Sequence, residues 1–486
     1  MHRALSGLAL TLALAAPAPA SAFCGFFVSG ADAALSNNAS QVALMRKGNR
    51  TVMTMSNNYQ GPPQDFAMVV PVPVVLQKEQ VKTLNPDVFN RVDQLSAPRL
   101  VEYWEQDPCR PRYEEMEDAA ASGGGPMKRS RGGRAMKDDD LGVKIEAQFE
   151  VGEYQILILS ANESSGLETW LRRNKYNIPK GAAEALAPYI RDQMKFFVAK
   201  VDIKKVHRDS HNAVVLSPLR FHFDAQELRL PVRLGLLNAT GKQDLIVYIL
   251  HPEKRFEVAN YPNLFIPTNL EVADKVRTYF GSFYAELFDE TLRRNNNKGV
   301  VTEYAWQTTG CDPCPTPPLT PADVATLGED VLNDGPPRKG RRPGPGGFFG
   351  ASSSYVLTRL HTRYDRAALS EDLIFREAKP VTGGRADGYG GLGDNGAKVE
   401  ESGVNNFQGR YIIRHYWTGA VACKEPRYGD WGGPPSGGGG EGTKAAQDLA
   451  NAPRGKVVLR EVVESAVPAF GITGKKRALR PGEKAR

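Results

Sequence analysis

Cys311 and Cys314 stand three residues apart, a spacing that suits a redox centre, half of a metal site or a structural disulfide. A redox pair of the thioredoxin type needs its first cysteine at the N-terminus of a helix, because the helix dipole lowers the pKa of the thiol. Pro315, Pro317 and Pro318 follow the pair, and a helix cannot run through them. A zinc site would need a second close pair of Cys or His, and the sequence offers only scattered partners. The spacing therefore favours a disulfide, and the redox and zinc alternatives stay open.

The other cysteines extend this interpretation to the whole chain. All of them follow residue 22, and an exported chain enters a compartment in which disulfides form and persist. Their spacings do not decide which cysteines pair. Every one is therefore a candidate for a structural disulfide: Cys24, Cys109, Cys311, Cys314 and Cys423.

A second group of possible ligands surrounds two histidines. His207 and His211 are four residues apart, with Asp209 between them and with His222 and Asp224 nearby. On a helix, this spacing would place both imidazoles on one face, where they could bind a metal. The segment lies between two predicted strands, however, so the spacing indicates a polar hairpin tip.

Three further patterns are weaker. The glycines of residues 388–393 match the G-x-G-x-x-G motif of dinucleotide-binding proteins, but no strand leads into the motif and no helix leaves it. The carboxylates at 114–115 and 138–140 lie in flexible sequence, whereas a glycosidase needs two carboxylates on a rigid frame. The aromatic segment 256–272 is interpreted as a buried crossover, with a ligand-facing groove as the alternative. The sequence therefore identifies no catalytic residue, no cofactor and no metal-ligand set.

The N-terminus predicts export. Residues 1–22 combine a short basic start, an apolar stretch and the small-residue triplet Ala20-Ser21-Ala22, as a cleaved secretory signal does. Cleavage there would make Phe23 the first mature residue, and a phenylalanine before Cys24 disfavours a lipid anchor. No later stretch reaches 18 apolar residues, so no transmembrane segment is predicted in the mature chain. We expect a periplasmic or extracellular protein.

The positive charge is concentrated in a few segments. The 486-residue chain has a formal charge of +7, and the surplus lies in residues 127–137, 338–342 and 474–486. These segments are interpreted as solvated loops, with attachment to anionic envelope polymers or lipid headgroups as the functional alternative. Nucleic acid is not an expected partner, because aromatic residues do not alternate with the basic ones.

The ordered sequence is interrupted by Gly- and Pro-rich inserts. These have too little apolar surface to offset the entropy of ordering, so we expect long disordered loops at 114–140, 333–347 and 383–403. The predicted organisation is a signal peptide at 1–22, one large domain at 23–428, and a Gly-rich linker with a basic C-terminal tail at 429–486.

Between the inserts, strands come in runs and helices are interspersed. Hairpins are predicted at 41–61 and 143–160, consecutive strands at 195–251, and further strands at 299–307, 353–364 and 409–417. Helices are predicted near 86–98, 163–174, 180–193 and 270–294 from the spacing of their apolar residues. Without a βαβ rhythm, this order favours an α+β fold with mostly antiparallel sheet.

The ordered segments together resemble the bacterial family called domain of unknown function 2330. The resemblance covers most of Cys24 to Cys423 and is carried by segments such as "NNYQGPPQDFAMVVPVP", "APRLVEYWEQDPC", "EYAWQTTGCDPCP" and "NFQGRYIIRHYWTGAVAC". It implies an exported bacterial protein with one large domain, in which all five cysteines match family positions. It implies no catalytic residue.

The sequence thus supports one main hypothesis for function and two alternatives. The main hypothesis is a non-catalytic binding or structural protein of the bacterial envelope. The alternatives are an envelope hydrolase with a site that the sequence does not reveal, and a metal-binding protein that uses Cys311 and Cys314.

Overall fold

The computed structural model describes most of the chain between residues 26 and 483. The described residues are 26–29, 39–57, 66–109, 143–174, 176, 178–208, 214–238, 241–311, 313–332, 354–384, 399–434, 443–445, 452–475, 478, 480 and 483. The predicted signal peptide, Cys24, the inserts at 114–140 and 333–347 and the basic segments at 127–137 and 338–342 lie outside these residues, as does most of the insert at 383–403.

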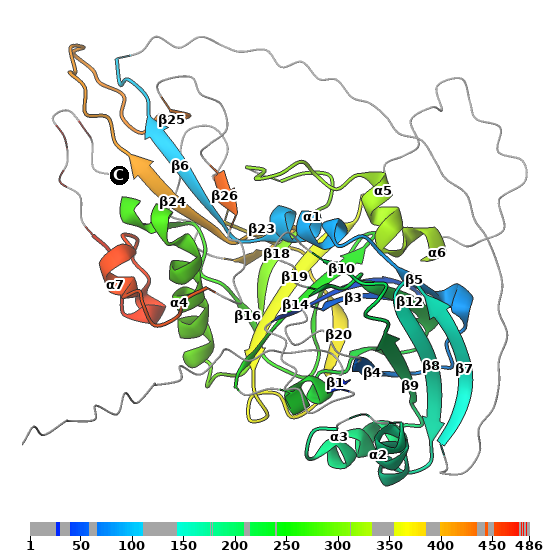
Figure 1. The fold of residues 1–486 in the computed structure, drawn as a ribbon. Helices are drawn as coiled ribbons and strands as arrows, with labels where there is room; N and C mark the ends of the chain where they lie inside the picture. Colours follow the sequence, from blue (N-terminus) through cyan, green and yellow to red (C-terminus); the bar gives the residue numbers. More distant parts are fainter. Residues whose placement is uncertain are drawn as a thin grey trace, which may run out of the picture.

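Two sheets packed on each other form the centre of the molecule (Figure 1). The smaller has the order β1 (Phe26–Ser29), β4 (Phe66–Val72), β9 (Lys195–Val201), β8 (Tyr154–Ala161) and β7 (Val143–Val151). The larger, with 11 strands, has the order β22 (Glu400–Glu401), β21 (Val381–Gly383), β23 (Asn406–Gln408), β18 (Val300–Gln307), β19 (Val356–Tyr364), β14 (Gln243–His251), β2 (Ala39–Lys47), β3 (Arg50–Asn57), β12 (Leu219–Asp224) and β5 (Val81–Thr83), and β16 (Asn263–Phe265) pairs with β18. One hydrophobic cluster joins residues of both sheets.

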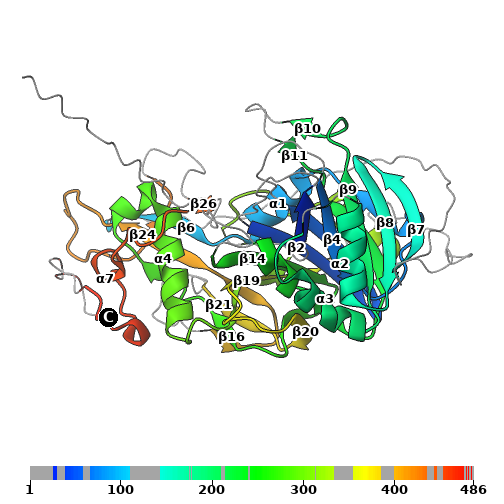
Figure 2. The same ribbon diagram turned by 60° about the horizontal axis from the view of Figure 1, so that its bottom comes forward.

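The smaller sheet is buried on both faces. Along β9, Phe197 and Ala199 belong to the cluster between the sheets, whereas Phe196 and Val198 face the opposite way. This alternation follows from the two-residue period of a strand, and it explains why β9 is a continuous apolar run in the sequence. Helices α2 (Ser164–Arg173) and α3 (Ala182–Arg191) cover the outer face, as Figure 2 shows.

The larger sheet has helices on its other face. Helix α1 (Asp87–Ser96) packs there with the short helices α5 (Pro321–Val324) and α6 (Asp330–Leu332). A third sheet lies beyond it, with the order β17 (Leu270–Glu271), β24 (Arg410–His415), β6 (Arg99–Glu105) and β25 (Trp431–Gly432), and β26 (Thr443–Ala445) pairs with β6. Helix α4 (Phe280–Arg293) packs against this sheet, and α7 (Leu459–Val462) lies beside α4.

Two small sheets complete the fold. One has three strands in the order β13 (Leu228–Leu230), β20 (Leu373–Ala378) and β15 (Arg255–Val258). The other is the hairpin of β10 (His207–Arg208) with β11 (Val214–Val215). Most strand pairs are antiparallel, but β2–β14, β16–β18, β21–β23, β17–β24 and β6–β24 are parallel. The predicted α+β class agrees with this mixture of strands and a few helices, while several sheets are mixed. No described helix is long and apolar enough to cross a membrane.

Most predicted elements are confirmed, and two differ. The segment 228–238 is a short strand followed by a 3-10 helix at Arg233–Asn238, because Pro231 cannot donate to a sheet and the apolar residues after it are buried as a compact turn. The predicted helix at 270–294 begins only at Phe280. Before it, β17 pairs with β24 and Asp274–Thr278 form a 3-10 helix.

The C-terminal segment also differs from a solvated tail. Residues 452–475 pack on α4 and β17, and Val462, Val463, Val467 and Ile472 are buried in the same cluster as α4. These apolar residues lie in the range 429–486, which the sequence predicts to be linker and tail. Their spacing is too irregular to predict an amphipathic element, although they contribute to the core.

Candidate functional site

The structure joins four of the five cysteines in two disulfides. Cys109, after β6, is bonded to Cys423, after β24, and Cys311 is bonded to Cys314; the Cα atoms are 5.6 and 5.0 Å apart. Buried Arg99 holds the smaller loop, because its Nη1 donates a 2.8 Å hydrogen bond to the carbonyl of Pro313. A bonded cysteine has no thiolate to offer to a metal or a substrate. A structural role for both bonds in the exported protein remains our prediction.

The histidine segment forms the hairpin that the sequence predicts, since β10 and β11 are antiparallel partners. Asp209 and His211 lie outside the described residues, as do the glycines of 388–393. Asp224 does not belong to a group of possible metal ligands among the described residues. Its carboxylate accepts hydrogen bonds of 2.6 and 3.1 Å from Arg50. The aromatic segment 256–272 carries β15, β16 and β17 between sheets, which supports the crossover interpretation.

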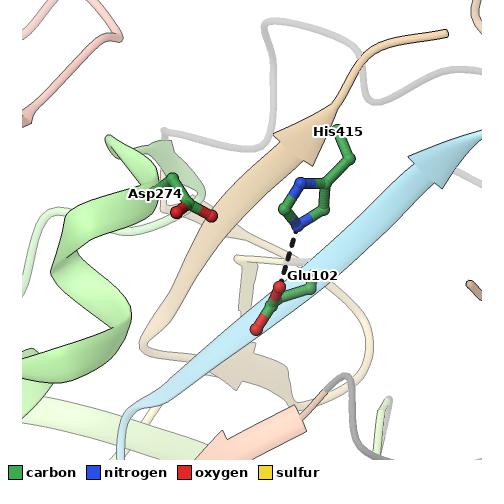
Figure 3. A group of neighbouring side chains, drawn as sticks. All are labelled: Glu102, Asp274 and His415. Atoms are coloured by element: carbon green, nitrogen blue, oxygen red, sulfur yellow. Dashed lines mark hydrogen bonds and ion pairs between the residues drawn. The ribbon is translucent and has the colours of Figure 1, made fainter. Parts of the chain in front are cut away.

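A histidine and two carboxylates meet beside β6 and β24 (Figure 3). Glu102 on β6, His415 at the end of β24 and Asp274 at the start of the 3-10 helix each place one possible ligand atom within 4.8 Å of the others. His415 Nε2 and Glu102 Oε2 are 2.8 Å apart. The imidazole also stacks on the ring of Trp104, its partner residue on β6, with 4.6 Å between centroids. These two contacts fix the orientation of the imidazole.

Arg277 fills the centre of this cluster. Its Nη2 donates hydrogen bonds of 2.8 Å to Glu102 and 2.6 Å to Asp274, and it lies 3.4 Å from His415 Nε2. The guanidinium thus occupies the position in which the three ligand atoms would hold a divalent ion. One guanidinium balances one of two carboxylates, so the cluster favours a cation, but a metal can bind only if Arg277 moves away.

We expect the variant Arg277→Ala to bind Zn²⁺ at least about tenfold more tightly than the wild type, because it removes a positive charge that directly contacts the ligand atoms. Isothermal titration calorimetry on the folded protein measures the difference. Adding His415→Ala to Arg277→Ala should abolish the gain. Equal affinities of the wild type and Arg277→Ala would contradict the assignment of Arg277 as the cation of the cluster.

A polar cavity of about 340 Å³ lies at the edge of the larger sheet, beside β18 and β23. It offers an indole, three side-chain amides and a single carboxylate. No cysteine, serine, threonine, histidine, lysine or arginine is among the described residues that line it. The cavity can therefore stack on a ligand and hydrogen-bond to it, but it has neither a nucleophile nor a pair of titratable groups. The lining residues are Glu253, Trp306, Gln307, Pro380, Gly403, Val404, Asn405 and Asn406.

Local contacts hold the polar groups of the cavity in place. The turn that carries Glu253 is fixed by His251, whose Nδ1 accepts the backbone N–H groups of Glu253 and Lys254 at 3.1 and 3.0 Å. Burial lowers the pKa of His251, which keeps this nitrogen available as an acceptor. Gln307 Oε1 accepts a 2.6 Å hydrogen bond from Ser354, and Asn405 Oδ1 accepts one of 3.3 Å from the backbone of Val381.

The largest group of buried charges lies inside the fold. Glu303 Oε1 is 2.7 Å from His361 Nδ1, and His361 Nε2 is 3.1 Å from Asp244 Oδ1. Glu303 also accepts hydrogen bonds from Arg359 and Tyr284, both at 2.5 Å. The remaining members are Asp93, Asp289, Arg363 and Arg454, which gives four carboxylates against three guanidinium groups and the imidazole.

Electrostatics within this network keep Glu303 charged. Burial alone would raise the pKa of its carboxyl, but the charges of His361 and Arg359 and the hydrogen bonds outweigh burial and lower it to about 2. His361 has the opposite balance: burial lowers its pKa, and the facing carboxylates raise it overall. Both side chains are almost fully buried, at 0% and 1% exposed. No substrate can reach them, so the network is a structural unit.

Sequence reasoning did not identify either the cavity or the cluster around His415. The cavity is assembled from four separate parts of the chain, near residues 253, 306, 380 and 405, and no local spacing connects them. His415 lies in a segment that is predicted as a strand, but Glu102 and Asp274 are far from it in sequence. For the buried charge network, the sequence does contain a signal: the charged residues Arg359, His361 and Arg363 alternate along β19, which indicates a polar face.

Comparison with known proteins places the chain in a family. No curated protein and no solved structure matches it significantly. A family model described as an uncharacterised protein conserved in bacteria, DUF2330, matches residues 18–376. The match ends before β24 and the C-terminal segment. Because it covers well over half of the sequence, the chain belongs to the DUF2330 family.

Proposed function

We propose that this protein is an exported, non-catalytic binding protein of the bacterial envelope. The observation that carries this proposal is the polar cavity beside β18 and β23, whose indole and amides suit recognition. A hydrolase needs two or three titratable groups that converge on an accessible pocket. The cavity has the single carboxylate of Glu253, and within the described part of its lining no second titratable group faces it.

Two other groups of charged residues, and the disulfide, favour binding over hydrolysis as well. Glu303 and His361, at the centre of the buried network, are 0% and 1% exposed, so a substrate does not reach them. The cluster around His415 is accessible, but Arg277 fills its centre, where a reacting atom or a metal would sit. A metal site at Cys311 and Cys314 would first require reduction of their disulfide.

The envelope enters the proposal through the sequence. The signal-like residues 1–22 support export to the periplasm or beyond, and the basic segments support contact with anionic polymers or lipid headgroups. Part of the C-terminal charge is used internally, because Lys475 pairs with Glu464 and Arg480 with Glu105. Residues 127–137 and 338–342 are therefore the better candidates for outward contact.

Co-sedimentation of the exported protein with isolated cell envelopes tests the proposal. We expect retention that falls as salt is raised, and that falls further when the lysines and arginines of 127–137 are replaced by glutamine. The matched control replaces five exposed basic residues at the C-terminal ends of α2 and α4 and should leave retention unchanged: Arg172, Arg173, Arg293, Arg294 and Lys298.

The same samples test the alternatives. Release of soluble envelope fragments during incubation would favour the hydrolase. Loss of retention with a chelator would favour the metal-binding alternative. No retention at any salt concentration would overturn the proposal.

A further inference from the structure

The chemistry of the polar cavity identifies a class of ligand. We propose that the cavity binds a neutral or amino-sugar segment of an envelope glycan; this inference rests on the proposed function and deepens it. The cavity volume of about 340 Å³ is at the lower end of the range for small-molecule sites, about 300–1,000 Å³. It suits a short stretch of a chain more than a large rigid ligand.

Trp306 supplies the apolar surface that such a ligand needs. It lies near the C-terminal end of β18, half-buried, and its ring is roughly parallel to that of Tyr304, with centroids 6.5 Å apart. An indole carries negative charge density on its face, which attracts the slightly positive C–H groups on one side of a sugar ring. The contact with the buried ring of Tyr304 holds the indole in position beside the cavity.

Three amides line the cavity together with the indole. Each amide has two N–H donors and an acceptor oxygen, which complement hydroxyl groups and the acetamido groups of amino sugars. The oxygens of Gln307 and Asn405 are already occupied by Ser354 and the backbone of Val381. Their NH₂ groups remain as donors for a ligand, while the internal bonds hold the two side chains in fixed orientations.

Asn406 adds an unsatisfied acceptor. Its Oδ1 is buried and has no hydrogen-bond partner among the described residues. A buried amide oxygen without a donor is destabilising, because it has lost its hydrogen bonds to water and gained none in the protein. A small rotation of this side chain towards a sugar hydroxyl would satisfy the oxygen, so ligand binding recovers a free-energy cost that the unbound protein carries.

The charge of the cavity disfavours anionic ligands. Glu253 is its single charged side chain, and no lysine or arginine lies in the described lining. A phosphate or carboxylate group would therefore meet a like charge and find no cation to pair with. The cavity and the basic segments thus favour different envelope groups: an uncharged or positively charged sugar in the cavity, and anionic groups at the loops.

Isothermal titration calorimetry of the protein with tri-N-acetylglucosamine tests the assignment. Val404 is on the rim and is 63% exposed, so Val404→Trp should obstruct the cavity without disturbing the core. Val458 is 46% exposed and lies in the C-terminal segment, away from the cavity, and Val458→Trp is the matched control. We expect the first variant to bind at least tenfold more weakly than the wild type, and the control to bind as the wild type does. Gln307→Ala should weaken binding several-fold, with an unchanged melting temperature.

The possible outcomes separate this inference from the proposed function. Retention on envelopes without binding of the sugar would overturn the sugar assignment and leave the proposed function intact. Sugar binding that is equal in Val404→Trp and Val458→Trp would place the sugar site elsewhere and also overturn the assignment. Calorimetric binding of a polar peptide that Val404→Trp weakens, without binding of the sugar, would identify a peptide ligand instead. Absence of retention on envelopes, with or without sugar binding, would overturn the proposed function itself.

Discussion

Replacement of Glu303 by alanine is expected to lower the free energy of unfolding by about 3–5 kcal/mol, as removal of one partner from a buried ion pair does. The variant leaves the guanidinium of Arg359, the imidazole of His361 and the hydroxyl of Tyr284 without the carboxylate that they share. Urea denaturation followed by circular dichroism measures the loss. The conservative variant Glu303→Gln keeps the shape but not the charge and should fall between the alanine variant and the wild type.

A surface pair provides the control. Glu401 pairs with Lys379 at 2.8 Å, but these side chains are 69% and 74% exposed. Glu401→Ala should leave stability unchanged within error, because solvent screens exposed pairs. A loss for Glu303→Ala as small as that for Glu401→Ala would show that the buried network is not a stabilising unit.

The same network makes stability depend on pH. A raised pKa for His361 means that its stabilisation is fully present below the unfolded value, about 6.5, and is lost as pH rises through the raised value. Glu303 has a lowered pKa, so its contribution is present above about 4.3 and is lost as pH falls towards about 2. The alkaline decline should be smaller in His361→Gln than in the wild type. Identical alkaline profiles would mean that His361 is not protonated in the folded protein.

The second large effect is expected at Cys423. Its disulfide with Cys109 spans 314 residues, and the chain-entropy argument gives a stabilisation of roughly 5–6 kcal/mol for a loop of that length. Cys423→Ser should therefore destabilise the oxidised protein strongly and leave the already reduced protein nearly unchanged. Thermal unfolding with and without reductant measures both effects.

The other disulfide is the matched control. It spans three residues, so the same argument gives only about 2 kcal/mol for Cys314→Ser. A larger loss for Cys314→Ser than for Cys423→Ser would show that the small loop does more than close a turn. In that case, the redox and metal alternatives for Cys311 and Cys314 would regain weight.

The sequence predicts local elements well because their periodicity follows from their own residues. The apolar residues Val88, Val92 and Leu95 of α1, and Leu167, Trp170 and Leu171 of α2, are buried as the helical spacing predicts. Pro71 has no N–H to donate to a neighbouring strand, which predicts that its end of β4 lies at a sheet edge. The structure agrees, because β1 pairs only with Phe66–Val69 and leaves β9 as the single neighbour at the proline.

Features that depend on distant segments are not predictable in this way. Arg359 and His361 alternate with apolar or hydroxyl-bearing residues on β19, a pattern typical of a solvent-facing strand. They are buried because α1 and α4, formed elsewhere in the chain, bring Asp93 and Phe288 onto that face. The polar cavity has the same origin, since its four contributing segments meet only when β18, β21 and β23 are paired. Composition and local spacing therefore do not predict contacts between segments that are distant in sequence.

The parallel pairing of β6 with β24 imposes an order on how the chain can assemble. Synthesis from the N-terminus delivers β6 some 300 residues before its partner, and Arg454, which bonds to Asp244 on β14 of the larger sheet, arrives later still. Until then, the apolar side of β6 has no neighbour, and folding through such distant contacts is slow. The nascent protein therefore passes through a long interval with an open sheet edge, during which it is most prone to aggregate through that edge.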